Sequence, residues 1–268
     1  EVLMKSQLFQ LAAVPLRAAG ALATSTTTNE DASSSAPSRP TSGNSGECQY
    51  PADVLDLQSW KVTLPTGGDD AEEIKQPELE TFAADPWFVA TENCDGIRFR
   101  SAVNGATTGN SAYPRSELRE MVSDGSDEAG WSTTEGTHTL TAKLAFTATP
   151  NDKPHVVGAQ VHGGDDDVTV FRLEGTELWI TDGDEPHHHL ITDNYQLGTV
   201  FEAKFVASDG KIEAYYNGEL QTTVESDASE AYFKTGAYTQ ANCDKSDPCD
   251  ESNYGEVVLY ELNVEHRE

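Results

Sequence analysis

The sequence predicts an all-β domain built as a sandwich or jelly roll. Two observations favour this class over a helical one: apolar side chains recur at every second position, and dipeptides typical of tight turns separate the segments in which they do so. In one segment the alternating apolar positions are Leu140, Ala142, Leu144 and Phe146. A period of two indicates a strand with one buried face, and many short strands at regular spacing are typical of sandwiches and jelly rolls.

The strand pattern continues along most of the chain. Strands are expected over residues 139–146, 168–173, 178–180, 200–206, 212–216, 220–224 and 256–264. Asn217-Gly218 lies between two of them and is the strongest hairpin signal, because both residues tolerate the positive φ angles of a two-residue turn. Asp209-Gly210 marks the preceding turn. A short helix is expected near residues 72–81, and we find no internal repeat and no second domain.

The first 47 residues are set apart by their composition. Residues 1–23 contain Met4-Lys5 followed by an apolar run and small residues, the layout of a secretory signal peptide. A frayed amphipathic helix is the alternative for this segment. Residues 24–47 are rich in Ser, Thr, Pro, Gly and Asn without periodicity, so a disordered linker is expected there. The folded domain should therefore comprise residues 48–268 of a secreted, extracellular protein.

The chain is strongly acidic. Its 17 Lys and Arg residues against 46 Asp and Glu residues give a formal net charge of −29. This balance disfavours nucleic acid and anionic membrane surfaces as partners, because both attract proteins with a basic excess. No apolar run approaches the ~20 residues that a membrane-spanning helix needs.

Four cysteines, at positions 48, 94, 243 and 249, suggest disulfides in a secreted chain. Four cysteines allow three connectivities. Cys243 and Cys249 flank a short polar loop, so we prefer a local bridge there with Cys48–Cys94 as the second. A zinc site is the alternative, although no C-x-x-C spacing supports it.

In three further segments the alternation gathers polar side chains on one strand face. They are Arg115, Glu117 and Arg119 in the first, Gln160 and His162 in the second, and Tyr232, Lys234, Gly236, Tyr238 and Gln240 in the third. Arg98, on a nearby strand, is a further candidate for substrate binding. If these rows share a sheet face, they form a long, partly cationic groove for an anionic, hydroxyl-rich polymer. Taken singly, each residue has an ordinary explanation, and only their coincidence supports this inference.

Other chemistries are disfavoured, and no metal site is predicted. The HHH run at residues 187–189 is expected to be a solvent loop, because adjacent histidines rarely converge on one ion. The DDD run at residues 165–167 lacks the spaced ligands of a calcium loop and is expected to be a charged turn. The chain has no G-x-S-x-G motif of a serine hydrolase. Glycosidase chemistry would need Glu117 as a general acid, yet the neighbouring cations should keep it ionised.

These segments also carry a family resemblance. The sequences RSELRE (115–120), QVH (160–162) and YFKTGAYTQ (232–240), with WKVTLP beginning at Trp60, resemble the signature segments of family 7 polysaccharide lyases, the alginate lyases. The resemblance spans about residues 50–264. It implies a jelly roll of two antiparallel sheets whose concave face binds alginate. It also implies cleavage by β-elimination, without a metal or organic cofactor.

The resemblance also implies roles for individual residues. Arg115 and Gln160 would contact the uronate carboxylate. His162 would be the base, and Tyr238 would be the acid. The match implies further groove residues, which are Glu117, Arg119, Lys234 and Gln240.

The chemistry of a uronate agrees with these roles. Removing the C5 proton builds negative charge on the adjacent carboxylate, so donors placed there stabilise the transition state more than the ground state. The C5 proton needs a base with a pKa near the working pH, and the C4 oxygen needs a donor. We expect cations to lower the pKa of Tyr238, so that it can also act as a base on mannuronate, whose C5 proton and leaving group lie on one side. Guluronate should need His162 and Tyr238 separately.

Polymannuronate is the expected preferred substrate. In the family, Val161 in the QVH motif tends to accompany mannuronate activity, whereas Ile tends to accompany guluronate activity. The third motif departs from the family at Thr235, where Ala is commoner. A lyase for another polyuronate such as glucuronan and a non-catalytic carbohydrate-binding jelly roll are the alternatives. We expect a monomer.

Overall fold

The computed structural model describes residues 48–268 except 69 and 165. The predicted signal peptide and linker lie outside these residues. Within the described part, the chain forms strands joined by turns and two short 3-10 helices, η1 (Pro51–Asp53) and η2 (Glu78–Thr81). None of the helices in this part is long and apolar enough to cross a membrane.

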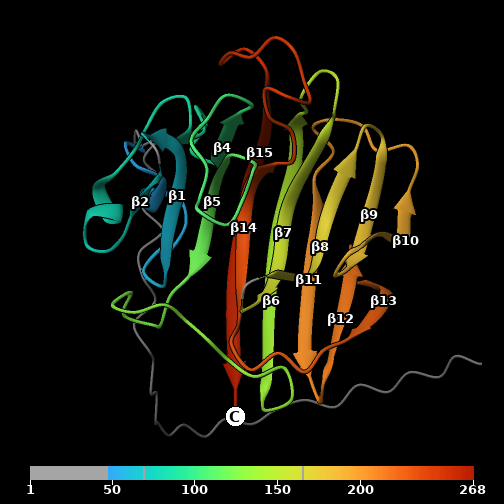
Figure 1. Ribbon diagram of the computed structural model, residues 1–268. Coiled ribbons are helices and arrows are strands. Elements are labelled where there is room, and N and C mark those ends of the chain that lie inside the picture. Colours follow the sequence, from blue (N-terminus) through green and yellow to red (C-terminus); the bar gives the residue numbers. More distant parts are fainter. Residues whose placement is uncertain (1–47, 69, 165) are drawn as a thin grey trace, which may run out of the picture. The chain divides into compact units, whose positions relative to one another are not determined.

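Two antiparallel sheets make up a jelly-roll sandwich (Figure 1). Among the described residues, the larger sheet has eight strands in the order β10 (Glu185–Thr192), β9 (Glu177–Asp182), β8 (Asp166–Glu174), β7 (His155–Gly163), β14 (Ala231–Thr239), β5 (Arg115–Glu120), β1 (Trp60–Gly67) and β2 (Ala71–Ile74). The smaller sheet, counted over the same residues, has seven strands in the order β13 (Glu219–Glu225), β12 (Lys211–Tyr216), β11 (Phe201–Ser208), β6 (Thr137–Ala148), β15 (Tyr254–Arg267), β4 (Ile97–Ala102) and β3 (Phe88–Ala90). The predicted all-β fold is confirmed.

The core lies between the two sheets and follows the predicted alternation. Leu140, Leu144 and Phe146 of β6 are fully buried, and they belong to one apolar cluster with Leu118 of β5 and Phe233 of β14. Side chains two residues apart on a strand share a face. The residues that alternate with these core positions on β5 and β14 therefore point to the outer face of the larger sheet.

The two predicted turns are both hairpins. Asn217 and Gly218, with φ angles of 51° and 80°, connect β12 to β13. Asp209 and Gly210, with φ angles of 51° and 75°, connect β11 to β12. Positive φ at both positions matches the twist of the flanking strands.

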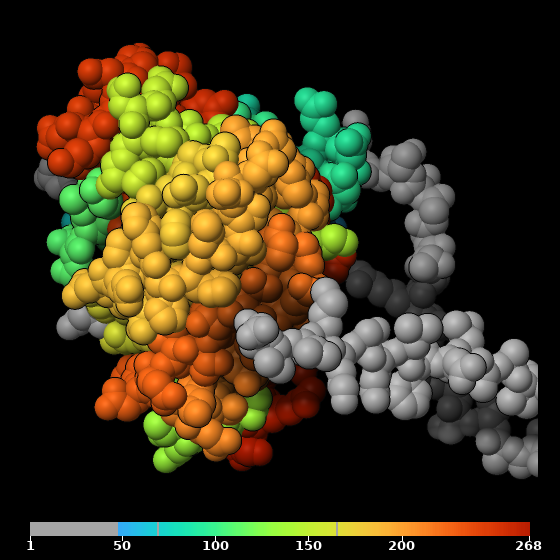
Figure 2. All heavy atoms as spheres, turned by 90° about the vertical axis from the view of Figure 1, so that its right-hand side faces the viewer, coloured from blue at the N-terminus to red at the C-terminus, as the bar shows by residue number. Residues whose placement is uncertain are grey.

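Three local predictions were wrong. Residues 72–81 form no single helix, because β2 pairs with β1 up to Ile74 and Pro77 then interrupts the segment before η2. The HHH run lies on β10 rather than in a loop. His188 there joins the two sheets through a 3.1 Å hydrogen bond between its Nε2 and Thr222 Oγ1 of β13. Strands β10 and β13 lie on the side of the domain that faces the viewer in Figure 2. The DDD run was predicted to be a charged turn, but strand β8 begins within it, at Asp166.

Both disulfides join the pairs preferred from the sequence. Cys48 is bonded to Cys94, and Cys243 is bonded to Cys249. The first bridge ties the start of the described chain to the turn between β3 and β4. The second closes the loop that follows β14, and no free cysteine occurs among the described residues.

Candidate active site

Polar rows run across the strands on the outer face of the larger sheet. One row follows successive cross-strand pairs through β1, β5, β14 and β7, and consists of Lys61, Arg119, Lys234 and Gln160. On either side of this row, Arg115 pairs with Tyr238, and Tyr232 pairs with His162. Neighbouring strands lie only about 4.8 Å apart. The pairing of β5, β14 and β7 therefore brings the three predicted segments together.

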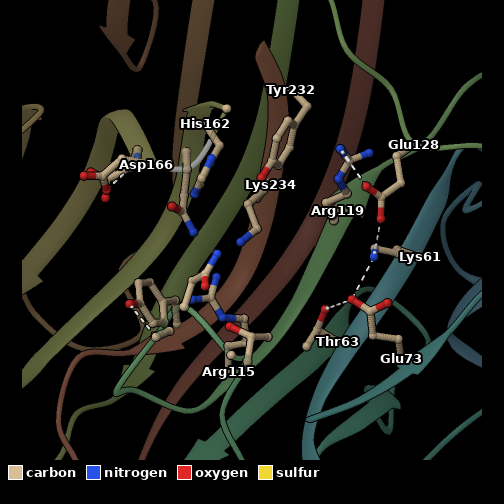
Figure 3. Close-up of a pocket in the computed structure, with 18 residues that line it drawn as sticks. Lys61, Thr63, Glu73, Arg115, Arg119, Glu128, His162, Asp166, Tyr232 and Lys234 are labelled. Carbon is tan, nitrogen blue, oxygen red and sulfur yellow. Dashed lines mark hydrogen bonds and ion pairs between the residues drawn. The ribbon is translucent and has the colours of Figure 1, made fainter. Parts of the chain in front are cut away.

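These rows line a cavity of about 360 Å³. Seven residues of the predicted polar rows contribute to its wall, namely Arg115, Arg119, Gln160, His162, Tyr232, Lys234 and Tyr238. Figure 3 shows Arg115, His162 and Lys234 directed into the same space from three adjacent strands. A reaction at one sugar ring requires this kind of convergence.

Glu117 lies beneath the cavity instead of lining it, so the prediction that it contacts substrate is corrected. Its fully buried Oε2 accepts hydrogen bonds from Arg115 Nη1 and Lys234 Nζ, at 2.9 Å each. Its Oε1 accepts a short hydrogen bond from Gln160 Nε2. Burial acts to raise the pKa of Glu117, but the charges of Lys234 and Arg115 outweigh burial and hold the pKa below its usual value. The expected ionised state therefore agrees with the structure, and the carboxylate holds three side chains in place.

A glycine allows β14 to pass close to Glu117. Gly236 is its cross-strand partner and has a φ angle of 143°, which side-chain-bearing residues rarely adopt. A Cβ atom at Gly236 would lie 2.8 Å from Glu117 Cα and 2.6 Å from the Ser116 carbonyl oxygen. This position of the third motif therefore requires glycine.

His162 offers an uncharged imidazole beside the cavity. Its Nδ1 is buried and has no hydrogen-bond partner among the described residues. Its ring stacks on that of Tyr232, with centroids 4.9 Å apart and an interplanar angle of 17°. Burial, assisted by the positive charge of Lys234, lowers the pKa of His162 to about 4. Near pH 7 the ring is neutral and can accept a proton.

Tyr238 is arranged as a proton donor. Its hydroxyl lies 3.0 Å from Ser111 Oγ, and the Arg115 guanidinium carbon stands 3.9 Å from the centre of its ring. Burial raises the pKa of Tyr238 and outweighs the opposing effect of Arg115. The expectation of a lowered pKa was therefore wrong. The phenol stays protonated near neutral pH.

Two predicted groove residues are absent from the cavity wall. Arg98 belongs to β4 of the smaller sheet, where its Nη2 is 2.8 Å from Asp85 and its Nε is 3.9 Å from Glu256. Strand β4 pairs with β3 and β15, so Arg98 cannot join the polar rows. Gln240 follows the last residue of β14, and its backbone N–H bonds to the His155 carbonyl. This bond extends the pairing of β14 with β7 by one residue, but Gln240 is absent from the cavity wall, and its contact with substrate stays a prediction.

Several lining residues were missed from the sequence. Lys61 and Thr63 of β1 line the cavity, and they alternate with the fully buried Val62 and Leu64. The period-two argument, applied to WKVTLP, would have found both. The loop at 108–111 and Glu128 also contribute to the wall. No periodic signal marks these loop residues.

The cavity is close to charge balance rather than cationic, which corrects the expectation from the strand rows. Its cations are Lys61, Arg115, Arg119 and Lys234, and its carboxylates are Glu73, Glu128, Asp166 and Asp167. Burial, with the nearby charge of Asp166, raises the pKa of Asp167 to about 6. A polyanion therefore gains little from the net charge of this site. It must bind through individual cations.

One group among the described residues has the spacing of metal ligands. Asp182, Glu185 and His188 place one ligand atom each within 4.8 Å of one another. The group lies on the β9–β10 hairpin, and none of its members lines the cavity. Chemistry in the cavity therefore does not involve these ligands.

Comparisons with known proteins agree on one family. The family model for alginate lyases matches residues 55–266. The crystal structure of an alginate lyase from Corynebacterium sp. is 60% identical, with a TM-score of 0.80, and the match covers 82% of this chain and 99% of that one. Alginate lyase AlgAT5, from polysaccharide lyase family 7, is 46% identical with a TM-score of 0.78 and the same coverage of both chains.

A shorter match links the chain to a curated relative. An alginate lyase of Klebsiella pneumoniae is 33% identical over 79 residues, which are 28% of this chain. The match spans about a quarter, 26%, of that relative's length.

Proposed function

This chain belongs to the alginate lyase family of polysaccharide lyases, and from that premise we propose that it cleaves alginate by β-elimination, prefers polymannuronate and acts outside the cell. One observation carries the catalytic part of the proposal. A neutral imidazole, a protonated phenol, a guanidinium group and a carboxamide line one cavity of about 360 Å³. They belong to His162, Tyr238, Arg115 and Gln160. Together they supply a base, an acid and donors for one carboxylate.

Arg115 and Gln160 are proposed to hold the uronate carboxylate. Each donates one hydrogen bond to Glu117 beneath the cavity and keeps further N–H groups for a ligand. As the C5 proton leaves, negative charge grows on the carboxylate. Donors that are already fixed by Glu117 need not reorganise to stabilise that charge.

His162 is proposed to take the C5 proton. Its low pKa keeps the imidazole uncharged, and its buried Nδ1 has no partner among the described residues. The stacked Tyr232 ring fixes the plane of the imidazole. Substrate carboxylates brought beside it would favour the protonated form, so the basicity of His162 should rise when substrate binds.

Tyr238 is proposed to donate a proton to the C4 oxygen that leaves. Its raised pKa keeps the hydroxyl protonated, and Arg115 lies over the ring. As the proton transfers, the developing phenolate lies next to that guanidinium, which stabilises it. In this assignment one residue removes the proton and another protonates the leaving group, which is the division of roles that guluronate requires. The mannuronate preference therefore does not rest on this assignment.

The mannuronate preference rests on the QVH motif. Val161 is fully buried in the core and cannot touch a sugar. Its influence on substrate choice must therefore act through the placement of its neighbours Gln160 and His162 on β7. The preference for mannuronate follows from the family tendency alone.

Secretion is supported by two features. The first is the predicted signal peptide in residues 1–23. The second is the pair of disulfides in the described domain, since disulfides persist mainly in oxidising compartments. The monomeric state stays a prediction.

A substrate panel tests the proposal. Polymannuronate, polyguluronate and glucuronan are each digested while the ultraviolet absorbance of the new conjugated uronate is followed. We expect the fastest rise on polymannuronate. A faster rise on polyguluronate would overturn the preference, a rise on glucuronan alone would overturn the assignment to alginate, and no rise on any polymer would overturn the lyase activity.

A further inference from the structure

Two cations at the β1 end of the cavity share one exposed carboxylate. Lys61 Nζ lies 2.7 Å from Glu128 Oε1, and Arg119 Nη2 lies 3.4 Å from Glu128 Oε2. Figure 3 shows Glu128 above Lys61 and beside Arg119, with Glu73 on the other side of Lys61. These contacts occupy the part of the site that lies farthest from His162 along the row of strands.

Lys61 and Arg119 extend the polar row beyond the reacting residues. They are cross-strand partners, and Arg119 pairs in turn with Lys234. Strand β1 lies three strand spacings from β7, the strand of His162, which is about 14 Å. A polymer held at His162 and running across the strands would bring a different sugar residue to Lys61. That residue carries its own carboxylate.

Glu128 differs from the other carboxylates that hold cations here. Glu117 is fully buried and fixed by three donors, and Glu73 lies on strand β2. The side chain of Glu128 is 51% exposed and belongs to the loop between β5 and β6. Of these three carboxylates, Glu128 is the most exposed, and it is the one that contacts both Lys61 and Arg119.

Lys61 does not depend on Glu128 for charge compensation. Its Nζ is also 2.7 Å from Glu73 Oε1, so the buried ammonium keeps a partner when Glu128 leaves. Arg119 likewise keeps its position over the Tyr232 ring, 3.9 Å from the ring centre. The hydrogen bond from Lys61 lowers the pKa of Glu128, so that its carboxylate is charged when the cavity is empty.

We propose that Lys61 and Arg119 form a distal subsite for a uronate carboxylate, and that Glu128 occupies this subsite until the substrate displaces it. Glu128 is then an internal competitor that sets affinity for long substrates. The inference rests on the proposed function, since it names a further contact of the same polymer. A carboxylate on the substrate takes over the two contacts that Glu128 releases into solvent. No covalent step is involved.

The test compares Glu128→Gln with wild type on oligouronates of increasing length and on polymer. The amide keeps the size of the side chain and removes its charge. We expect KM for substrates long enough to reach β1 to fall about fivefold, the scale of one partly exposed ion pair, while KM for the shortest cleaved oligomer falls much less. Glu261→Gln is the matched control, because Glu261 pairs with Lys143 at 2.8 Å on the smaller sheet, away from the cavity.

A double-variant cycle identifies the cation. In a Lys61→Met background, Glu128→Gln should lose most of its effect on KM, because the Lys61 ammonium group that Glu128 covers is no longer present. Thermal unfolding of each variant shows whether Lys61→Met is folded, and the single Glu128→Gln result stands without it.

Two outcomes overturn the inference. A rise in KM with Glu128→Gln would make Glu128 a support for the two cations, and a KM change equal at all lengths would place its effect outside a distal subsite. Failure of the proposed function looks different, since wild type would then release no unsaturated product from any polyuronate.

Discussion

The Glu117 carboxylate and the Lys234 ammonium group form an ion pair of 2.9 Å in which both side chains are withdrawn from solvent, with exposures of 0% and 9%. Burial lowers the pKa of Lys234, and the charge of Glu117 opposes that effect. Glu117 therefore favours the charged form of Lys234 inside the cavity wall. It does so only while the Glu117 carboxylate is ionised.

Replacing Glu117 should cost both stability and activity. In Glu117→Gln the Arg115 and Lys234 charges lose their common partner, and removing one member of a buried pair typically costs about 3–5 kcal/mol. We expect the free energy of unfolding in denaturant to fall by that order, with lyase activity largely lost. Glu261→Gln removes a carboxylate from an exposed pair and should change neither. Unchanged stability in Glu117→Gln would show that the carboxylate is not the anchor of this network.

Removing the hydroxyl of Tyr238 tests its role as the acid. In Tyr238→Phe the ring can still stack against Arg115, but no proton is available for the leaving oxygen. We expect kcat to fall by about 10²–10⁴-fold, the usual contribution of a general acid, while binding of oligouronates measured by calorimetry persists. Tyr215→Phe, on β12 of the smaller sheet, provides a matched control with normal kcat. A near-normal rate in Tyr238→Phe would contradict the assignment.

Local alternation predicted the faces of single strands well. Leu118 and Arg119 lie on opposite sides of β5, as Val161 and His162 do on β7. Successive side chains of a strand point to opposite faces of the sheet. Once the strands pair, this alternation also determines which of their residues face the cavity.

The arrangement of strands could not be predicted in the same way. The alternation along β4 places Arg98 on the side away from the core, but β4 belongs to the smaller sheet and not to the sheet that carries the cavity. Which sheet a strand joins is set by contacts between distant segments, and no local period records it. Glu128 was missed for a related reason. Its role depends on the return of a loop toward β1 and not on any repeat in the sequence.

The pH dependence of activity should report the low pKa of His162. The pKa is lowered to about 4, so the base is neutral above that pH and becomes protonated as the pH falls through it. We expect kcat/KM to stay near its maximum down to about pH 5 and to fall below it. On the alkaline side, the raised pKa of Tyr238 should keep the acid protonated past pH 10.

Two other kinds of group titrate in the same pH range, so the protonation of His162 needs a measurement of its own. Asp167, with a pKa of about 6, and the substrate carboxylates both change charge as the pH falls. Nuclear magnetic resonance of the imidazole in the free enzyme, assigned with His162→Gln, follows His162 alone. A midpoint at or above 6.5 would mean that the imidazole is not desolvated as the structure indicates.

The two disulfides should contribute unequally to stability. In the chain-entropy description, a bridge stabilises by restricting the unfolded chain, and its effect grows with the length of the loop that it closes. Cys48–Cys94 spans 46 residues, whereas Cys243–Cys249 spans 6. The expected losses on replacing each pair by serines are about 4 and about 2 kcal/mol respectively. Denaturant unfolding of the two double variants, with wild type in parallel, measures the difference. A larger loss for the short loop would mean that Cys243–Cys249 instead holds native structure in place after β14, and lyase activity would then fall with it.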